Sequence, residues 1–195
     1  MRQTLPGTTI EADLSCSGTV AALLDPLFLT GGLMLSQVAR LTGLEPYVIQ
    51  NWVRRGFVSP PQRKRYSYRQ FCRIAMINML KDALQLDRIC TLLSYVNGQL
   101  DDESDDLIDD VQLYRYLVDL AALAQSRPAQ LENHLEGWCV QVLEGYVEPV
   151  PGARRRVDQV LSAALMAYLS GVLRRRAEEL TAALQDAPTE KEDQT

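Results

Sequence analysis

Residues 36–74 read SQVARLTGLEPYVIQNWVRRGFVSPPQRKRYSYRQFCRI, and this stretch decides the fold that the sequence predicts. Gly43 separates two segments in which apolar residues recur at steps of three and four, the period of an amphipathic helix. Two short helices joined by a glycine turn form the helix-turn-helix pattern, in which the second helix can enter the major groove of DNA.

Residues that begin and end helices support this pattern. Ser36 can cap the first helix, Pro46 suits the first turn of the second, and Gly56 stops it. Residues 57–67 are too proline-rich for a helix and are predicted to form a basic wing containing a short hairpin. The S-x-x-Q sequence at 67–70 is a capping box that opens a helix to about residue 84, and a further helix at 86–98 closes on a glycine.

Two helices, a basic wing and two more helices resemble the DNA-binding domain of MerR-type regulators. The resemblance is carried by LSQVARLTGL, by I-x-x-W-x-x-x-G-x-V-x-P-P at 49–61, by Arg65-Tyr66 and by the helix pair behind them, over about 65 residues. The chain also resembles bacterial proteins known as a domain of unknown function with a MerR-like helix-turn-helix, and that similarity continues through LSYVNGQLDDESDDLIDD. The resemblance implies a DNA-binding fold and distortion of the DNA, but no target.

The charge of the chain is unevenly distributed. The net charge is −5, yet residues 36–73 hold eight basic residues and one acid, so this segment carries +7 and the remainder −12. A basic block in an acidic protein is typical of a local nucleic-acid surface, although a basic face can also be simply solvated.

The residues that we expect to contact DNA come from the two helices and the wing. Glutamine and asparagine can pair with adenine and arginine with guanine, whereas the wing cations suit phosphates. Gln50-Asn51 replace the arginine and aromatic residue of many MerR-type regulators, and the wing is short, so no base preference is predicted. The candidate residues are Ser36, Gln37, Tyr47, Gln50, Asn51, Arg54, Arg55, Arg63, Lys64, Arg65, Tyr66 and Arg69.

The apolar residues of this domain are predicted to form its core. Trp52 belongs to this set rather than to a base-stacking surface, because it is in phase with Val48 and Ile49. The predicted inward residues are Val38, Leu41, Leu44, Val48, Ile49, Trp52, Phe57, Phe71, Ile74, Ile77, Leu84, Ile89, Leu92 and Leu93.

The predicted domain order is an N-terminal arm or short helix (1–32), the MerR-like domain (33–98), a helical dimerisation or effector module (99–187) and a disordered tail (188–195). Residues 1–19 show little pattern and are predicted to be loosely structured. Residues 19–29 predict a short helix interrupted by Pro26, which either packs on the DNA-binding domain or reaches across to a partner subunit.

An acidic run, residues 99–110, holds seven acids in twelve positions. A calcium loop counted from Asp101 fails, because Asp106 stands where glycine is needed and Gln112 where glutamate is needed. The run is therefore predicted to be a helix N-terminus capped by Ser104. A further alternative is that it masks the basic block when DNA is absent.

The rest of the chain predicts helices at 105–125, 129–147 and 154–184, with a turn at 148–152. Residues 160–173 are nearly all apolar but rise only about 21 Å, against the roughly 30 Å of a bilayer core. We therefore expect no membrane span, and we expect this segment to be buried or to form a dimer interface. A small-molecule pocket is a further hypothesis, near Trp138, Tyr146 and Tyr168.

Few residues suit catalysis. His134 is the one histidine, the four cysteines are scattered, and no phosphate-binding glycine loop or nucleophile motif occurs, so we expect no enzyme, metal or cofactor. Single cysteines favour a cytoplasmic location. The sequence thus predicts an all-α protein, with a MerR-like winged helix-turn-helix before an all-helical module. We expect a transcription regulator that binds double-stranded DNA as a homodimer, with an unknown small-molecule effector. The alternative is a protein-interaction adaptor that keeps the winged-helix fold without base readout.

Overall fold

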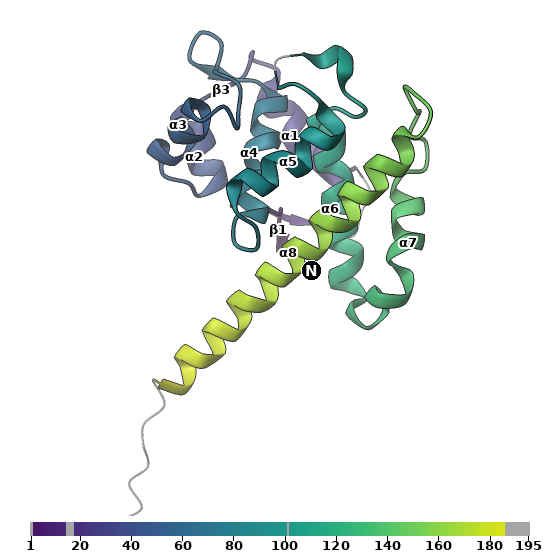
Figure 1. Cartoon of the computed structure of the whole chain (residues 1–195). Helices are drawn as coiled ribbons and strands as arrows, with labels where there is room; N and C mark the ends of the chain where they lie inside the picture. Colours follow the sequence, from purple (N-terminus) through teal and green to yellow (C-terminus); the bar gives the residue numbers. More distant parts are fainter. Residues whose placement is uncertain (1, 15–17, 101, 186–195) are drawn as a thin grey trace, which may run out of the picture.

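A computed structural model describes residues 2–14, 18–100 and 102–185. These ranges form a predominantly helical structure, as predicted, with two small antiparallel sheets of two strands each, β1–β2 and β3–β4 (Figure 1). The elements are β1 (Arg2–Thr4), β2 (Glu11–Asp13), α1 (Thr19–Phe28), β3 (Leu33–Met34), α2 (Leu35–Thr42), α3 (Pro46–Arg54), β4 (Arg65–Tyr66), α4 (Tyr68–Leu80), α5 (Leu86–Asn97), a 3-10 turn (Glu103–Asp105), α6 (Asp110–Ser126), a 3-10 turn (Pro128–Gln130), α7 (Leu131–Val142) and α8 (Ala153–Gln185).

Helix α4 is the centre of the core. It is buried from Gln70 to Leu80 except at Asn78, and it packs against α2, α5, α6 and α8. Helices α2 and α5 come from the predicted DNA-binding domain, and α6 and α8 from the predicted C-terminal module. Both sets pack on the apolar surface of α4, so the two parts of the chain fold into one body around it. The predicted core is confirmed: ten of its fourteen residues are buried, and the other four, which are half-buried, pack against it, namely Leu41, Val48, Leu84 and Leu92.

The N-terminal segment contradicts the prediction that it lacks structure. Strands β1 and β2 form a hairpin, and Leu5 is completely buried. The Tyr114 hydroxyl donates to the Pro6 carbonyl at 2.8 Å, and the Asn78 amide donates to the Gly7 carbonyl at 2.9 Å. Strands of three residues are too short to show alternation, so no periodic pattern indicates them in the sequence. Helix α1 follows and packs on its own chain, where Phe28 stacks on Tyr68 at 4.6 Å.

The predicted capping box is confirmed. The Ser67 hydroxyl accepts from the Gln70 N–H at 3.2 Å, and the Gln70 side chain accepts from the Ser67 N–H at 2.8 Å. Helix α4 then ends at Leu80 rather than Leu84, because a turn precedes α5. Pro46 begins α3, as predicted.

The predicted cap of the first helix was wrong. Helix α2 begins at Leu35, so Ser36 lies inside its first turn rather than before it. The N–H of Met34 is instead satisfied by the side chain of Gln37, at 2.8 Å.

The acidic run is mostly a loop, and α6 starts only at its end. Asp109, not Ser104, caps α6, accepting from the N–H groups of Val111 and Gln112 at 2.7 and 3.1 Å. Asp102 accepts from Ser104 within the 3-10 turn. The prediction of an acidic helix N-terminus is therefore correct for Asp109 but wrong for Ser104, since aspartate caps as well as serine.

Helices α6, α7 and α8 complete the body. Helix α7 ends at Val142, so Tyr146 lies beyond it and its hydroxyl donates to the Leu107 carbonyl at 2.6 Å. Helix α8 packs on α4, α5, α6 and α7 in its first half and then projects away from the body (Figure 1). Among the helices of the described ranges, none has both the length and the apolarity that a membrane span requires. The predicted tail, 188–195, lies outside the described residues.

Candidate nucleic-acid interface

Helix α3 buries one face and exposes the other. Ile49 and Trp52 are in the core, at 0% and 2% exposure. Tyr47, Gln50 and Arg54 are exposed and follow each other at steps of three and four, so they lie along one side of the helix. The helix thus presents a tyrosine, an amide and a guanidinium to solvent on a single face.

A tight basic turn stands beside this face. The Arg65 N–H donates to the Gln62 carbonyl at 2.8 Å, and between them Arg63 and Lys64 take left-handed backbone conformations, with φ of 48° and 63°. Two consecutive positive φ values are typical of a hairpin turn. Strand β4 pairs with β3, Tyr66 opposite Leu33, which holds the turn against the segment that precedes α2. Arg63 and Lys64 are exposed at its tip.

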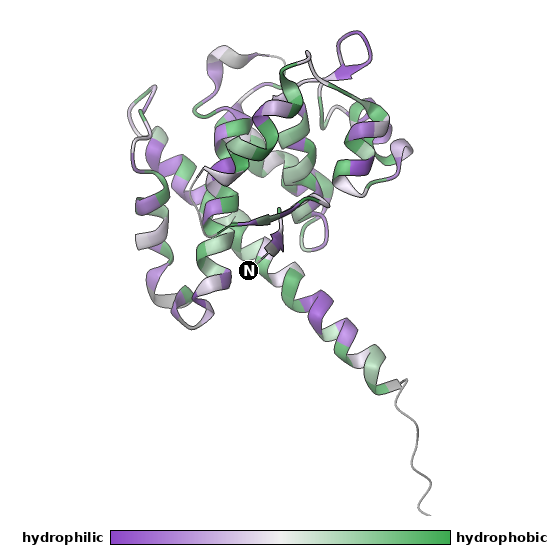
Figure 2. Cartoon of the chain, turned by 180° about the vertical axis from the view of Figure 1, so that it is seen from behind, coloured by the Kyte–Doolittle hydropathy of each residue, from purple (hydrophilic) through white to green (hydrophobic). Residues whose placement is uncertain are grey.

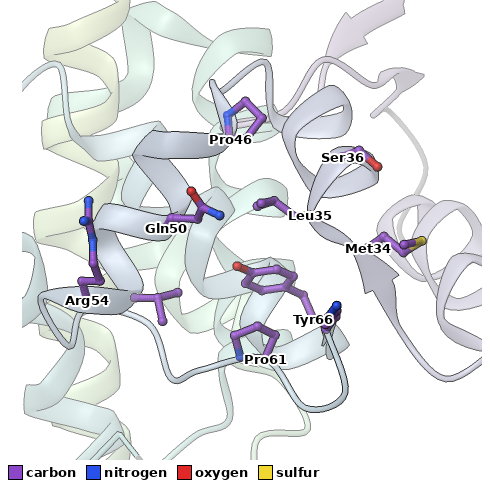
Figure 3. A pocket seen from close by; sticks show the side chains of 10 residues that line it. Met34, Leu35, Ser36, Pro46, Gln50, Arg54, Pro61 and Tyr66 are labelled. Atoms are coloured by element: carbon purple, nitrogen blue, oxygen red, sulfur yellow. The ribbon is translucent and has the colours of Figure 1, made fainter.

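A hollow of about 790 Å³ separates α3 from this turn (Figure 3). Gln50 and Arg54 reach it from α3, and Tyr66, buried at 3% exposure, lies between Gln50 and Pro61. Most of its lining residues are apolar or aromatic, and it carries the cations Arg54 and Lys64. Its lining residues are Met34, Leu35, Ser36, Pro46, Gln50, Val53, Arg54, Pro61, Lys64 and Tyr66.

Several candidate residues are occupied by contacts within the chain. Arg55 pairs with Asp87 at 3.2 Å and stacks over Phe57, and an Arg65 guanidinium N–H donates to the Gly32 carbonyl at 2.8 Å. Arg69 pairs with Asp106 at 2.7 Å. Asn51 is half-buried.

Other candidates remain available to a partner. Ser36, Gln37, Tyr47, Gln50 and the three cations Arg54, Arg63 and Lys64 are exposed, and within the described ranges no carboxylate pairs with those three cations.

The acidic run neutralises part of the basic block. Asp106 and Asp110 face Arg69 and Arg73, and the Arg73 Nε donates to the Phe57 carbonyl at 2.9 Å. Burial outweighs the attraction of Arg69 and raises the pKa of Asp106 to about 6. Burial also raises the pKa of Asp110, against the pull of Arg73 and Arg69. The described carboxylates of the run thus pair with two arginines on α4 and with none on α3 or at the turn. That the run masks the basic block when DNA is absent stays a prediction.

The apolar lining of the hollow was not predicted. Met34 and Pro61 meet there only because β3 pairs with β4, which joins segments about thirty residues apart. A pairing between strands so far apart in the chain leaves no periodic pattern in either segment. Only a relation between the residues of the two strands could have indicated it from the sequence.

The three aromatic residues that were predicted to lie near a small-molecule pocket are in the core of the protein. Trp138, Tyr146 and Tyr168 are buried, and none of them lines the hollow of about 650 Å³ between the β1–β2 hairpin, α6 and α7. Within the described residues, no group of three histidine, cysteine or carboxylate side chains could hold a metal. Cys72, Cys90 and Cys139 are free thiols.

Comparison with known proteins places this surface in a region without an assigned function. Residues 31–117 match the domain of unknown function DUF1836, which spans the segment from before β3 into α6. The chain is 25% identical to the uncharacterized protein YkrK of Bacillus subtilis over 159 residues, covering 76% of this chain and 68% of that protein. No solved structure matches the chain significantly. These comparisons support a bacterial domain of unknown function.

Proposed function

We propose that this protein is a sequence-specific DNA-binding transcription regulator, in which α2 and α3 act as a MerR-like helix-turn-helix. The observation that carries the proposal is the exposed side of α3, where Gln50 and Arg54 stand beside the cationic turn of Arg63 and Lys64. A major groove admits one helix, and its base edges offer hydrogen-bond partners for amide and guanidinium groups.

The division of roles follows from position. Gln50 and Arg54 would read base edges, and Arg63 and Lys64, at the tip of the turn, would hold phosphates on one side of the helix. The apolar lining between them, including Met34 and Val53, suits thymine methyl groups and sugar carbons. The acidic remainder of the chain would disfavour other approaches of DNA.

The proposal is tested by incubating the protein with genomic DNA fragments at moderate salt and sequencing the fragments that it retains. The affinity for an enriched sequence is then measured by fluorescence anisotropy. Arg54→Ala should weaken specific binding by roughly 1–3 kcal/mol and relax the base preference, since it removes a base contact. Arg63→Ala should weaken all sequences alike and lower the salt slope by about 1. Arg155→Ala, an exposed arginine on α8, is the control. Unchanged affinity in both variants would overturn the proposal.

The mostly apolar lining of the hollow favours a second candidate, a protein-interaction adaptor. In that case DNA would not be retained even at low salt, and Val53→Glu would abolish capture of a defined protein partner while Arg155→Ala would not.

A further inference from the structure

The hollow between the β1–β2 hairpin, α6 and α7 is more polar than the one beside α3. Seven of the eleven residues that line it are polar or charged, and its volume of about 650 Å³ falls within the roughly 300–1,000 Å³ of small-molecule sites. Arg127 belongs to the turn that joins α6 to α7, and Figure 2 shows that this turn is hydrophilic. The carboxylates of Asp13 and Asp119 and this one guanidinium give the lining a net charge of −1. That charge favours a cationic ligand.

Asp119 lies on the side of α6 that faces the hollow, because Ala122 and Ser126 follow it at steps of three and four and also line the hollow. Its side chain is half-buried, and among the described residues no hydrogen-bond donor or cation pairs with its carboxylate. Burial raises the pKa of Asp119, because it removes water from the charged form. A ligand that brings a positive charge would offset this loss of hydration.

The polar groups near Asp119 offer acceptors rather than donors. The Gln125 amide donates to the Tyr168 hydroxyl at 3.1 Å, which engages its amino group and leaves its carbonyl oxygen for a ligand. The Ser126 hydroxyl donates to the Leu123 carbonyl at 2.9 Å, so its lone pairs remain to accept. Asp13, the last residue of β2, adds an exposed carboxylate from the hairpin. A ligand with several N–H donors matches these groups.

Apolar residues complete the lining from all three elements. Leu14 follows β2, Ala122 and Leu123 belong to α6, and Val142 ends α7. An ammonium ion alone would leave this apolar surface uncovered, whereas methylene groups can pack on it. The lining therefore suits a molecule that has charged ends and an aliphatic middle.

We propose that this hollow binds a small aliphatic diamine. One ammonium group would pair with Asp119 and donate to the Gln125 carbonyl oxygen, and the other would pair with Asp13. The methylene chain between them would pack on Leu123 and Val142. The hollow shares no lining residue with the one beside α3, so the inference goes beyond the proposed function and does not depend on DNA binding.

Isothermal titration calorimetry of the full chain with putrescine and cadaverine, at about 0.15 M salt, tests the proposal. Each diamine should bind as a single molecule per chain. Butylamine, which has one ammonium group, should bind at least about 10-fold more weakly than putrescine. Asp119→Asn should weaken putrescine binding at least about 10-fold, because a neutral hydrogen bond replaces a charge-assisted one. Glu45→Gln is the matched control, since it removes one charge from an exposed side chain outside the hollow, and it should bind putrescine like the wild type.

A wild-type chain that binds neither diamine at about 10 mM would overturn the proposal, as would an Asp119→Asn variant with wild-type affinity. The second carboxylate is tested by Asp13→Asn, which should bind putrescine and butylamine about equally. If Asp13→Asn kept the full preference for putrescine, the two-carboxylate arrangement would be refuted. Equal helical circular dichroism checks that the variants are folded. Arg54→Ala should bind putrescine like the wild type, so diamine binding without DNA binding would refute only the proposed function.

Discussion

Arg73 and Asp110 form a charge pair that the core of the protein shields from water. Their side chains are 5% and 1% exposed, and the guanidinium lies 3.4 Å from the carboxylate. The Arg73 Nε also donates to the Phe57 carbonyl, just after α3. At the scale of single residues, this pair links the start of α6 to the end of the helix that is proposed to read DNA.

Replacing Arg73 with methionine should lower the free energy of unfolding by about 3 kcal/mol, the low end for a broken buried pair, because it leaves the buried Asp110 with only Arg69, 3.6 Å away, as a charged partner. The double variant Arg73→Met/Asp110→Leu should recover most of that loss, since it removes both charges and fills their space. Urea denaturation followed by circular dichroism measures both. If Arg73→Met were as stable as the wild type, the Asp110 carboxylate would have to be solvated by water in the folded protein.

At the scale of elements, the features that the sequence predicted correctly are those set by residues close together in the chain. The capping box of Ser67 and Gln70 set the start of α4, and Pro46 that of α3. The sequence also placed Gln50 and Arg54 on one side of α3, because helical period is a local property. It did not reveal the β1–β2 hairpin, the burial of Tyr66 or the pairing of Arg69 with Asp106, because each depends on residues distant in the chain.

The hairpin is held through Gly7. Its φ is +73°, and a Cβ at this position would lie 2.0 Å from the carbonyl oxygen of Ala75, a backbone atom of the central helix. Any side chain would therefore have to push the hairpin off α4.

Gly7→Ala should destabilise the protein by roughly 2 kcal/mol or more, combining the cost of a left-handed alanine with the clash. Gly31→Ala is the control, because Gly31 has a φ of +85° but nothing within 4 Å of the added Cβ. It should lose only about 1–2 kcal/mol. Thermal denaturation of the two variants separates these effects, and equal losses would mean that the hairpin does not sit tightly on α4.

At the scale of the whole molecule, opposite charges are sorted into different places. The basic block supplies the exposed face of α3 and the turn, while the acidic run folds back beneath it and is partly buried. Asp106 illustrates the cost of this arrangement: its side chain is 7% exposed, and one carboxylate oxygen has no hydrogen-bond partner among the described residues. Ionising such a group opposes folding.

The free energy of unfolding should therefore depend on pH through the ionisation of Asp106. Because the pKa of Asp106 is raised from 3.8 to about 6 on folding, its contribution to the free energy of unfolding is fully present below about pH 4 and is lost as the pH rises through 6. The neighbouring charges Arg69, Asp110 and Asp105 all contribute to this pKa.

Asp106→Asn removes the titration, so the stability of the variant relative to the wild type should rise between pH 4 and pH 7. Urea denaturation at several pH values measures the difference. Arg54→Ala is the control, because it alters an exposed cation on α3 and should keep the wild-type pH dependence. A difference between Asp106→Asn and the wild type that stays constant with pH would mean that Arg69 holds Asp106 ionised throughout, and that the acidic run is anchored by its charge.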